Sequence, residues 1–213
     1  MSLASFLSLL ALCCYLGLIV VVVFRGRTKK TNQIFLYFLT AMTLWQLCGL
    51  IISTTSEPEV AVWAYRASGV MVVGYALAFF LFSRSFLHER GQTKLVSWGI
   101  IAFCAAILLN ASSLTIPEVY RDPQTGLLVP HLGPATPVVG LIYYSFLVCA
   151  VWNLVRGYRS SPAVQHRNRI TYLTMAAMVV IVGSASNLFS SLKGYPLDVS
   201  ANVLGAVLIA YTI

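Results

Sequence analysis

The sequence predicts an all-α integral membrane protein, a seven-transmembrane helix bundle with its amino terminus outside the cell and its carboxyl terminus in the cytoplasm. Three observations predict it. The 213 residues are 59% hydrophobic and 9% charged, with a mean hydropathy of +0.83, whereas about 25% of residues are charged in soluble proteins. The apolar residues form long runs separated by short polar linkers. The basic residues gather in alternate linkers, which sets the orientation.

Turn and capping residues mark where the apolar runs begin and end. The expected spans are Leu3 to Phe24, Gln33 to Ser53, Ala61 to Phe82 within a helix from Pro58 to Arg90, Leu95 to Asn110, Thr136 to Val155, Ser161 to Leu188, and Asp198 to Ile213. At ~1.5 Å per residue the third span is ~33 Å long, enough to cross a hydrocarbon core of ~30 Å. Ser56, Thr136 and Ser161 each stand before a proline and are expected to cap the helix that follows.

The first span is expected to be retained in the mature protein. No basic residue precedes Leu3 to Phe24, and four follow it. A cleavable signal peptide carries its positive charge before the apolar stretch, so the pattern here is the reverse of a signal.

The linker between the fourth and fifth spans is the one sizeable loop, 111–135. Within it, residues 119–121 and 127–129 form two short strand-like runs, joined by the Asp-Pro-Gln-Thr-Gly sequence of residues 122–126. Proline fixes φ in such a turn and glycine supplies the left-handed position. The sequence therefore predicts a small extracellular β-hairpin between helices 4 and 5.

The distribution of charge predicts the orientation. Eleven of the 14 lysines and arginines lie in the linkers after the first, third and fifth spans: Arg25, Arg27, Lys29, Lys30, Arg84, Arg90, Lys94, Arg156, Arg159, Arg167 and Arg169. The other linkers hold only Arg121 and Lys193. Short basic linkers remain in the cytoplasm, which indicates a multi-pass protein of the cytoplasmic (inner) membrane. These clusters are expected to meet anionic membrane lipids and no nucleic acid.

Arg66 is the remaining basic residue and the only charge within the third span. At helical rise it lies roughly 12 Å beyond Pro58, and an ionisable group at that depth is costly unless it has a partner or faces water. One hypothesis is an outward-facing pocket in which Arg66 binds an anionic or carboxylate ligand and the hairpin forms part of a lid. The expected ligand-binding residues are Arg66, Gln46, Trp45, Tyr65, Asn187 and Asn202. In the alternative, Arg66 bonds backbone carbonyls or reaches Glu59, and the asparagines join helices.

Several membrane functions lack the residues that their chemistry needs. A retinal protein requires a lysine within the last helix, but all four lysines lie in linkers. Membrane haem requires facing histidines within the bilayer, and His88, His131 and His166 lie at helix ends or in a loop. The five cysteines sit in apolar runs without metal-ligand spacing. We therefore expect no cofactor, no metal site and no catalytic residue in this chain.

Short motifs along the chain resemble a known family. They are Lys-Thr-Asn-Gln-Ile-Phe at 30–35, Leu-Trp at 44–45, Trp-Ala-Tyr-Arg at 63–66, the proline and glycine of 137–140, Gln-His-Arg-Asn-Arg at 165–169, Ser-Asn-Leu at 186–188 and Ala-Tyr at 210–211. Their order is similar to the amino-terminal seven-helix region of bacterial and archaeal sensor histidine kinases, also found on some diguanylate cyclases. The resemblance implies a sensory input domain, homodimeric in the full-length protein, that feeds a cytoplasmic PAS, kinase or cyclase domain.

Two classes of function remain. In the first, residues 1–213 are a single sensor domain whose seventh helix, short and without a basic anchor, leads into a cytoplasmic output domain; it would bind an extracellular or membrane-borne ligand and pass on a helix shift. In the second, the chain is a self-contained small membrane protein that binds or transports a polar or anionic solute or a lipid. The length of the reading frame beyond Ile213 distinguishes the two.

Overall fold

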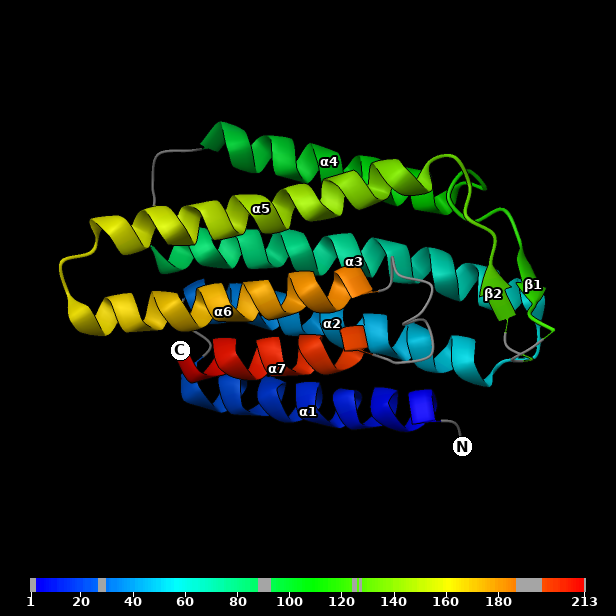
Figure 1. Ribbon diagram of the computed structural model, residues 1–213, viewed down its shortest axis with the longest axis horizontal. Coiled ribbons are helices and arrows are strands. Elements are labelled where there is room, and N and C mark those ends of the chain that lie inside the picture. The colour runs from blue at the N-terminus through cyan, green and yellow to red at the C-terminus, as the bar shows by residue number, and fades with distance from the viewer. Residues whose placement is uncertain are drawn as a thin grey trace.

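In the residues that the computed structural model describes, which are 3–26, 30–87, 93–123, 126, 128–186 and 197–212, the chain forms seven α-helices and two short strands (Figure 1). Their bounds are α1 Leu3–Gly26, α2 Lys30–Thr54, α3 Pro58–Phe86, α4 Thr93–Ala111, β1 Val119–Arg121, β2 Leu128–Pro130, α5 Thr136–Ser160, α6 Val164–Ser186 and α7 Leu197–Thr212. Within this described part, the first six helices are long and apolar enough to cross a membrane, and α7 is a shorter apolar helix.

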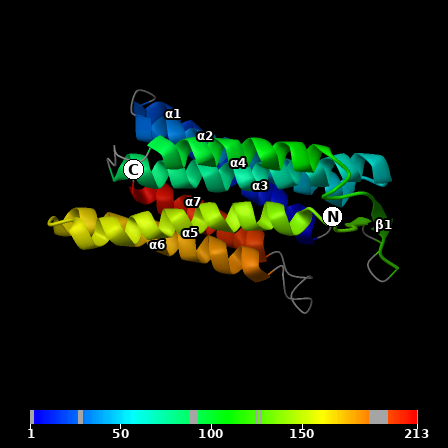
Figure 2. The ribbon, with the colours of Figure 1, turned by 90° about the horizontal axis from the view of Figure 1, so that it is seen from above.

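The helices lie side by side and alternate in direction, so the bundle has two distinct ends (Figures 1 and 2). We call the end with the α2–α3 turn and the strands the hairpin end. The opposite end, which carries the α5–α6 turn and the last residues of α7, is the basic end. α1 begins at the hairpin end and α7 finishes at the basic end (Figure 1).

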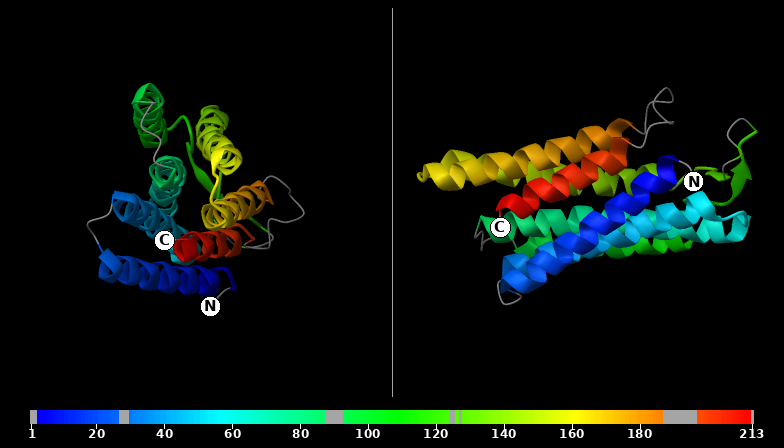
Figure 3. Two further views of the ribbon diagram at one scale, coloured as in Figure 1. Left: turned by 90° about the vertical axis from the view of Figure 1, so that its left-hand side faces the viewer. Right: turned by 90° about the horizontal axis from the view of Figure 1, so that it is seen from below.

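α3 is the helix around which the others are arranged. It packs against α2, α4, α5 and both strands, while α7 packs against α6 and α1 (Figure 3). Aromatic rings fill the α2–α3 contact: Phe38 lies 6.1 Å from both Tyr75 and Phe79, and Phe35 lies 5.7 Å from Phe82. In a membrane, where lipid is as apolar as the helices, such close packing is a main source of cohesion.

Three expected caps are wrong. The N-cap of α3 is Glu57, without a side-chain bond, and the N-cap of α5 is Ala135. The Thr136 hydroxyl instead donates a 2.7 Å bond to the carbonyl of Thr115, because the returning loop supplies an acceptor there. Ser161 is the C-cap of α5, and α6 begins three residues later. Proline at the start of α3 and α5 suffices to mark the first turn.

The loop between α4 and α5 is held by its own backbone. β1 pairs antiparallel with β2, and β2 begins one residue later than the sequence predicts. Gly126 has a φ of 69° and donates a 2.8 Å bond to the Asp122 carbonyl. Closer to the bundle, the Gly133 amide donates a 2.7 Å bond to Thr115, and a Cβ at Gly133 would overlap the carbonyl oxygen of Leu114. Glycine at this position lets the two sides of the loop approach.

Replacing Gly133 with alanine should therefore destabilise the protein. A new methyl group against a backbone carbonyl cannot be accommodated by a side-chain rotation, and overpacking of this kind costs about 1–3 kcal/mol. The matched control is Gly140→Ala in α5, where the added methyl meets nothing within 4 Å and improves helix propensity by about 1 kcal/mol. Thermal unfolding in lipid nanodiscs measures both; equal melting temperatures for the two variants would contradict the tight loop closure.

Candidate functional site

The first turns of α3 hold the loop. The Arg66 guanidinium donates twice to the carbonyl oxygen of Ile116, from Nε at 3.0 Å and from Nη2 at 2.8 Å. The hydroxyl of Tyr65 donates a 2.9 Å bond to the carbonyl of Leu128 in β2. Two consecutive side chains of one helix thus fix both sides of the loop.

The charge of Arg66 is stabilised by neutral groups. Besides the Ile116 carbonyl, its guanidinium lies 5.2 Å from the centre of the Trp63 ring, within cation–π range. Its other donors have no hydrogen-bond partner among the described residues. The sequence left two interpretations of Arg66, an anion-binding residue or a residue that bonds backbone carbonyls, and the structure contains the bond to a carbonyl. It also shows why the charge is tolerated, because α3 is flanked here by polar loop backbone.

A second group of polar side chains lies inside the bundle. The hydroxyls of Tyr75 on α3 and Tyr143 on α5 share a buried hydrogen bond of 2.9 Å. The Tyr143 hydroxyl also bonds Ser184 Oγ on α6 at 2.8 Å. The two tyrosine rings meet edge to face at 5.8 Å, and Trp45 of α2 lies 5.9 Å from Tyr75. Four helices therefore meet through this chain of hydroxyls and rings.

α7 and α1 bring further polar groups to the same region. Asp198, in the first turn of α7, lies near Tyr143 and near Tyr15 of α1, and Tyr15 in turn lies near Tyr75. One turn after Asp198, Asn202 donates a 2.8 Å bond from Nδ2 to the Asp198 carbonyl. Asn202 and Tyr15 are both 0% exposed.

Gln46 lies level with this region on α2. The 3.2 Å bond between Ser5 and Ser53, and the approach of Ser8 to Gly49, fix the antiparallel register of α1 and α2. That register places Gln46 about one helical turn from Tyr15 along the bundle. We call the set the polar cluster: Tyr15, Gln46, Tyr75, Tyr143, Ser184, Asp198 and Asn202.

Three side chains of the polar cluster are buried without satisfying every polar atom. Among the described residues, Tyr15 Oη, Gln46 Nε2 and Asn202 Oδ1 have no hydrogen-bond partner. A buried donor or acceptor left unpaired costs about 1–3 kcal/mol, and native structures contain few of them. The three side chains lie on α2, α1 and α7, and α1 packs against both of the other helices.

A small cavity adjoins the polar cluster. A cavity of about 10 Å³ lies next to Tyr75, where α2, α3, α5, α6 and α7 meet, and it is lined otherwise by apolar side chains. That volume is near the minimum for a single water molecule. A larger ligand enters this cavity only if the helices move apart.

The structure divides the expected ligand residues into two groups. Arg66 and Tyr65 contact the loop, whereas Gln46, Trp45 and Asn202 belong to or border the polar cluster, and no hydrogen bond joins Arg66 to Gln46 in the described part of the chain. Asn187 lies outside the described residues. Sequence reasoning missed Tyr15 and Tyr75. Their position offered a signal, because tyrosines at a membrane interface lie at the ends of spans and these two lie well inside theirs.

Metal-binding side chains are not grouped in the described ranges. No three His, Cys, Asp or Glu residues there lie within reach of one ion. The described polar cluster offers hydroxyl, amide and carboxylate groups, which suit hydrogen bonding to a small polar molecule.

Six long apolar helices and a shorter seventh in the described chain, surrounding a polar interior, define a multi-pass helical membrane protein. A model of the N-terminal 7TM region of histidine kinase matches residues 7–213, nearly the whole chain. The chain belongs to this family, which confirms the resemblance indicated by its short motifs; it is a transmembrane sensor domain of histidine-kinase signalling. Comparison with curated proteins gives no match.

Tyr143→Phe should destabilise the bundle because it removes the bonds to both Tyr75 and Ser184. Interhelical hydrogen bonds in membranes average ~0.6 kcal/mol each, so the expected loss is about 1 kcal/mol. The neighbouring Tyr144→Phe is the control, because the Tyr144 hydroxyl has no hydrogen-bond partner in the described residues. Thermal unfolding measures the difference, and equal stability of the two variants would show that the hydroxyl chain contributes nothing.

Arg66→Ala should loosen the loop. Bonds from charged groups contribute about 1.5–3 kcal/mol, so exchange of the Gly133 and Ala135 amides, which close the loop, should accelerate about tenfold or more. Tyr65→Phe, the control, should affect mainly the strand around Leu128. Hydrogen–deuterium exchange with mass spectrometry reports both. Unchanged exchange in Arg66→Ala would instead favour Arg66 as a fixed charge for an anionic ligand.

Proposed function

We propose that this sensor domain responds to a small polar ligand, extracellular or membrane-borne, that engages the polar cluster, and that α7 transmits the response to a cytoplasmic output domain. The hairpin end faces outward and the basic end faces the cytoplasm of the cell membrane. The concentration of lysine and arginine in the linkers of the basic end supports this orientation. The family supports an output domain of the histidine-kinase type. A PAS or cyclase domain and a homodimeric full-length protein are further parts of the proposal.

One observation carries the proposal: α7 contributes Asn202 and Asp198 to the polar cluster and packs against both α6 and α1. α7 is the last helix and finishes at the basic end (Figure 1). A ligand that forms a hydrogen bond with Asn202 therefore acts directly on α7, the helix proposed to lead to the output domain.

The unpaired atoms supply the free energy for a switch. In the resting arrangement Gln46 Nε2, Tyr15 Oη and Asn202 Oδ1 lack partners among the described residues. We propose that a ligand with both donors and acceptors satisfies them in an arrangement with separated helices, since the cavity beside Tyr75, which holds about one water, does not accommodate it. Such a ligand binds the open arrangement more tightly than the closed one, which is the requirement for shifting the equilibrium.

Arg66 and Tyr65 have a different role in this proposal. Tyr65 attaches strand β2 to α3, and Arg66 attaches the loop segment before β1 to the same helix. Tyr65 precedes Tyr75 by ten residues on α3. The hairpin then forms part of a lid over the outward end of the bundle. An anionic ligand binds Arg66 only after the hydrogen bonds between Arg66 and the Ile116 carbonyl break. Gln46, Trp45 and Asn202 are the ligand-facing residues inside the bundle.

Variants of the polar cluster should shift the position of α7 in opposite directions. A fluorotyrosine placed at Tyr211, whose ring lies 5.4 Å from Tyr172 of α6, reports the α6–α7 contact by ¹⁹F NMR in nanodiscs. The minor resonance of this probe belongs to the open arrangement. Gln46→Met removes an unpaired donor from the resting bundle and so stabilises the resting arrangement. A stabilisation of about 1.4 kcal/mol lowers the intensity of the minor resonance tenfold. Tyr143→Phe breaks resting hydrogen bonds and should raise the same resonance.

Leu47→Met is the matched control, because it introduces the same side chain one position along α2 at a residue that is 43% exposed. It should leave the spectrum unchanged. The proposal fails if Gln46→Met and Leu47→Met give the same populations, or if Gln46→Met and Tyr143→Phe shift them in the same direction.

A further inference from the structure

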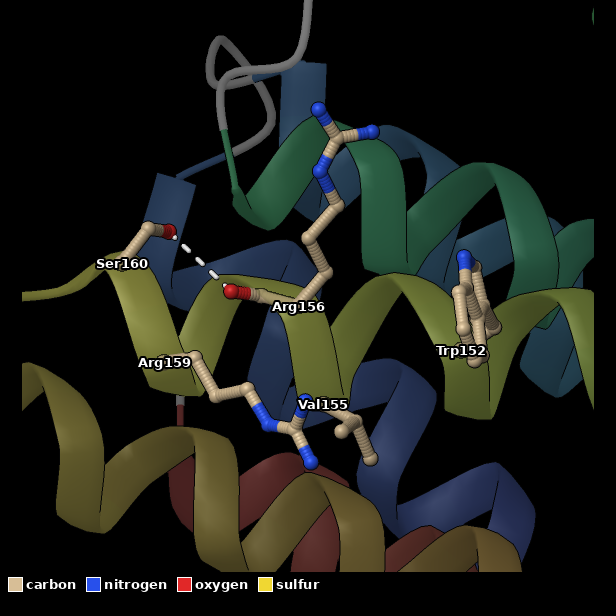
Figure 4. A pocket seen from close by; sticks show the side chains of 5 residues that line it. All are labelled: Trp152, Val155, Arg156, Arg159 and Ser160. Atoms are coloured by element: carbon tan, nitrogen blue, oxygen red, sulfur yellow. Dashed lines mark hydrogen bonds between the residues drawn. The ribbon is translucent and has the colours of Figure 1, made fainter.

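A groove on the outer surface of α5 lies far from the polar cluster, at the basic end. It encloses about 330 Å³ and is lined by side chains of the last turns of α5: Trp152, Val155, Arg156, Arg159 and Ser160 (Figure 4). Arg156 and Arg159 extend to opposite sides of the helix, and Trp152 lies further along it (Figure 4). The groove therefore combines two positive charges with an aromatic ring.

The two arginines of this groove have no charged or hydrogen-bonding partner for their guanidinium groups among the described residues. Other arginines in the described chain do: Arg66 bonds the Ile116 carbonyl, and Arg167 donates a 2.9 Å bond to the Tyr158 hydroxyl and lies 4.4 Å from the centre of its ring. Both arginines are exposed, so their guanidinium groups are free to bind an anion at the groove. Both arginines lie in the last turns of α5, where the negative end of the helix dipole stabilises positive charge.

An apolar stripe runs from the groove along α5. Leu141, Val148 and Trp152 are 69%, 62% and 70% exposed, and their spacing of seven and four residues puts them on one face of the helix. In a chain that spans a membrane, this face meets acyl chains. Trp152 lies between the stripe and the arginines, which is the usual place of tryptophan at the boundary of hydrocarbon and headgroups.

We propose that this groove is a binding site for an anionic phospholipid, with the phosphate bound at the groove by Arg156 or Arg159, whose side chains flank it, and an acyl chain lying along the stripe. Guanidinium groups bind phosphate oxygens in bidentate geometry, and basic pockets at the headgroup level of membrane helices suit anionic lipid heads. The stripe distinguishes a lipid from free phosphate, because only a lipid has a chain to cover it. The site is independent of the ligand proposed for the polar cluster.

Retention of lipid in native mass spectrometry tests the site on the whole chain. Phosphatidylglycerol and phosphatidylcholine are added to the wild type, to Arg156→Gln/Arg159→Gln and to Lys94→Gln/Arg169→Gln. The last is the matched control, since it removes two charges, both exposed, from the same end of the bundle. The wild type should retain phosphatidylglycerol preferentially, the groove variant should lose about tenfold in apparent affinity for it, and the control should keep most of it.

Two further arms separate the alternatives. Arg156→Lys/Arg159→Lys keeps the charge and should retain more phosphatidylglycerol than the glutamine variant. Millimolar inorganic phosphate should not displace the lipid, because it cannot cover the stripe. Equal losses in the groove and control variants, or undiminished retention in the groove variant, would overturn the site; complete displacement by inorganic phosphate would replace the lipid with a free anion.

Discussion

A polar atom inside a membrane bundle must find its partner within the protein, because lipid tails offer none. This constraint separates the polar side chains of the chain into two kinds. Arg66, with the strongest need for a partner, has two hydrogen bonds to one carbonyl. Gln46 and Asn202 are more deeply buried and keep unpaired atoms within the described chain. Satisfied groups maintain an architecture, whereas unsatisfied ones leave free energy for a ligand or a rearrangement to recover.

α3 connects these two kinds of group. Its first turns hold the loop through Tyr65 and Arg66, and about 14 Å further along the helix Tyr75 joins the hydroxyl chain to Tyr143. A helix packed on three sides by α2, α4 and α5 moves as a unit. In the proposed mechanism, displacement of the hairpin would therefore change the geometry at Tyr75, and separation of the bundle at Tyr75 would strain the hairpin. In the proposed mechanism, α3 would thereby connect the lid to the polar cluster.

The sequence was sufficient for the spans and insufficient for the contacts between them. Long apolar runs and alternating basic linkers predict seven helices, because length and charge are properties of each segment alone. The faces of those helices are not predictable in the same way: these membrane helices are apolar on nearly every side, so the pattern does not show which side turns inward. The sequence thus places Gln46 and Trp45 in one site with Arg66, whereas Trp45 packs on Tyr75 and no hydrogen bond joins Gln46 to Arg66 in the described residues. Likewise, the sequence predicts Thr136 as the cap of α5, but its hydroxyl donates a hydrogen bond to the carbonyl of Thr115, 21 residues earlier in the chain.

α5 connects the polar cluster inside the bundle to the groove at the basic end. Tyr143 stands in the polar cluster near one end of α5, and Arg156 and Arg159 stand in the groove near the other. The proposed lipid at the basic end would restrain the position of α5 and so affect the Tyr75–Tyr143–Ser184 contacts, which join α3, α5 and α6. Coupling of this kind requires the lipid to bind one arrangement of α5 more tightly than the other, and by linkage a ligand at the polar cluster would then alter lipid affinity by the same factor. Membrane composition would thereby set the threshold of a sensor whose ligand acts at the opposite end.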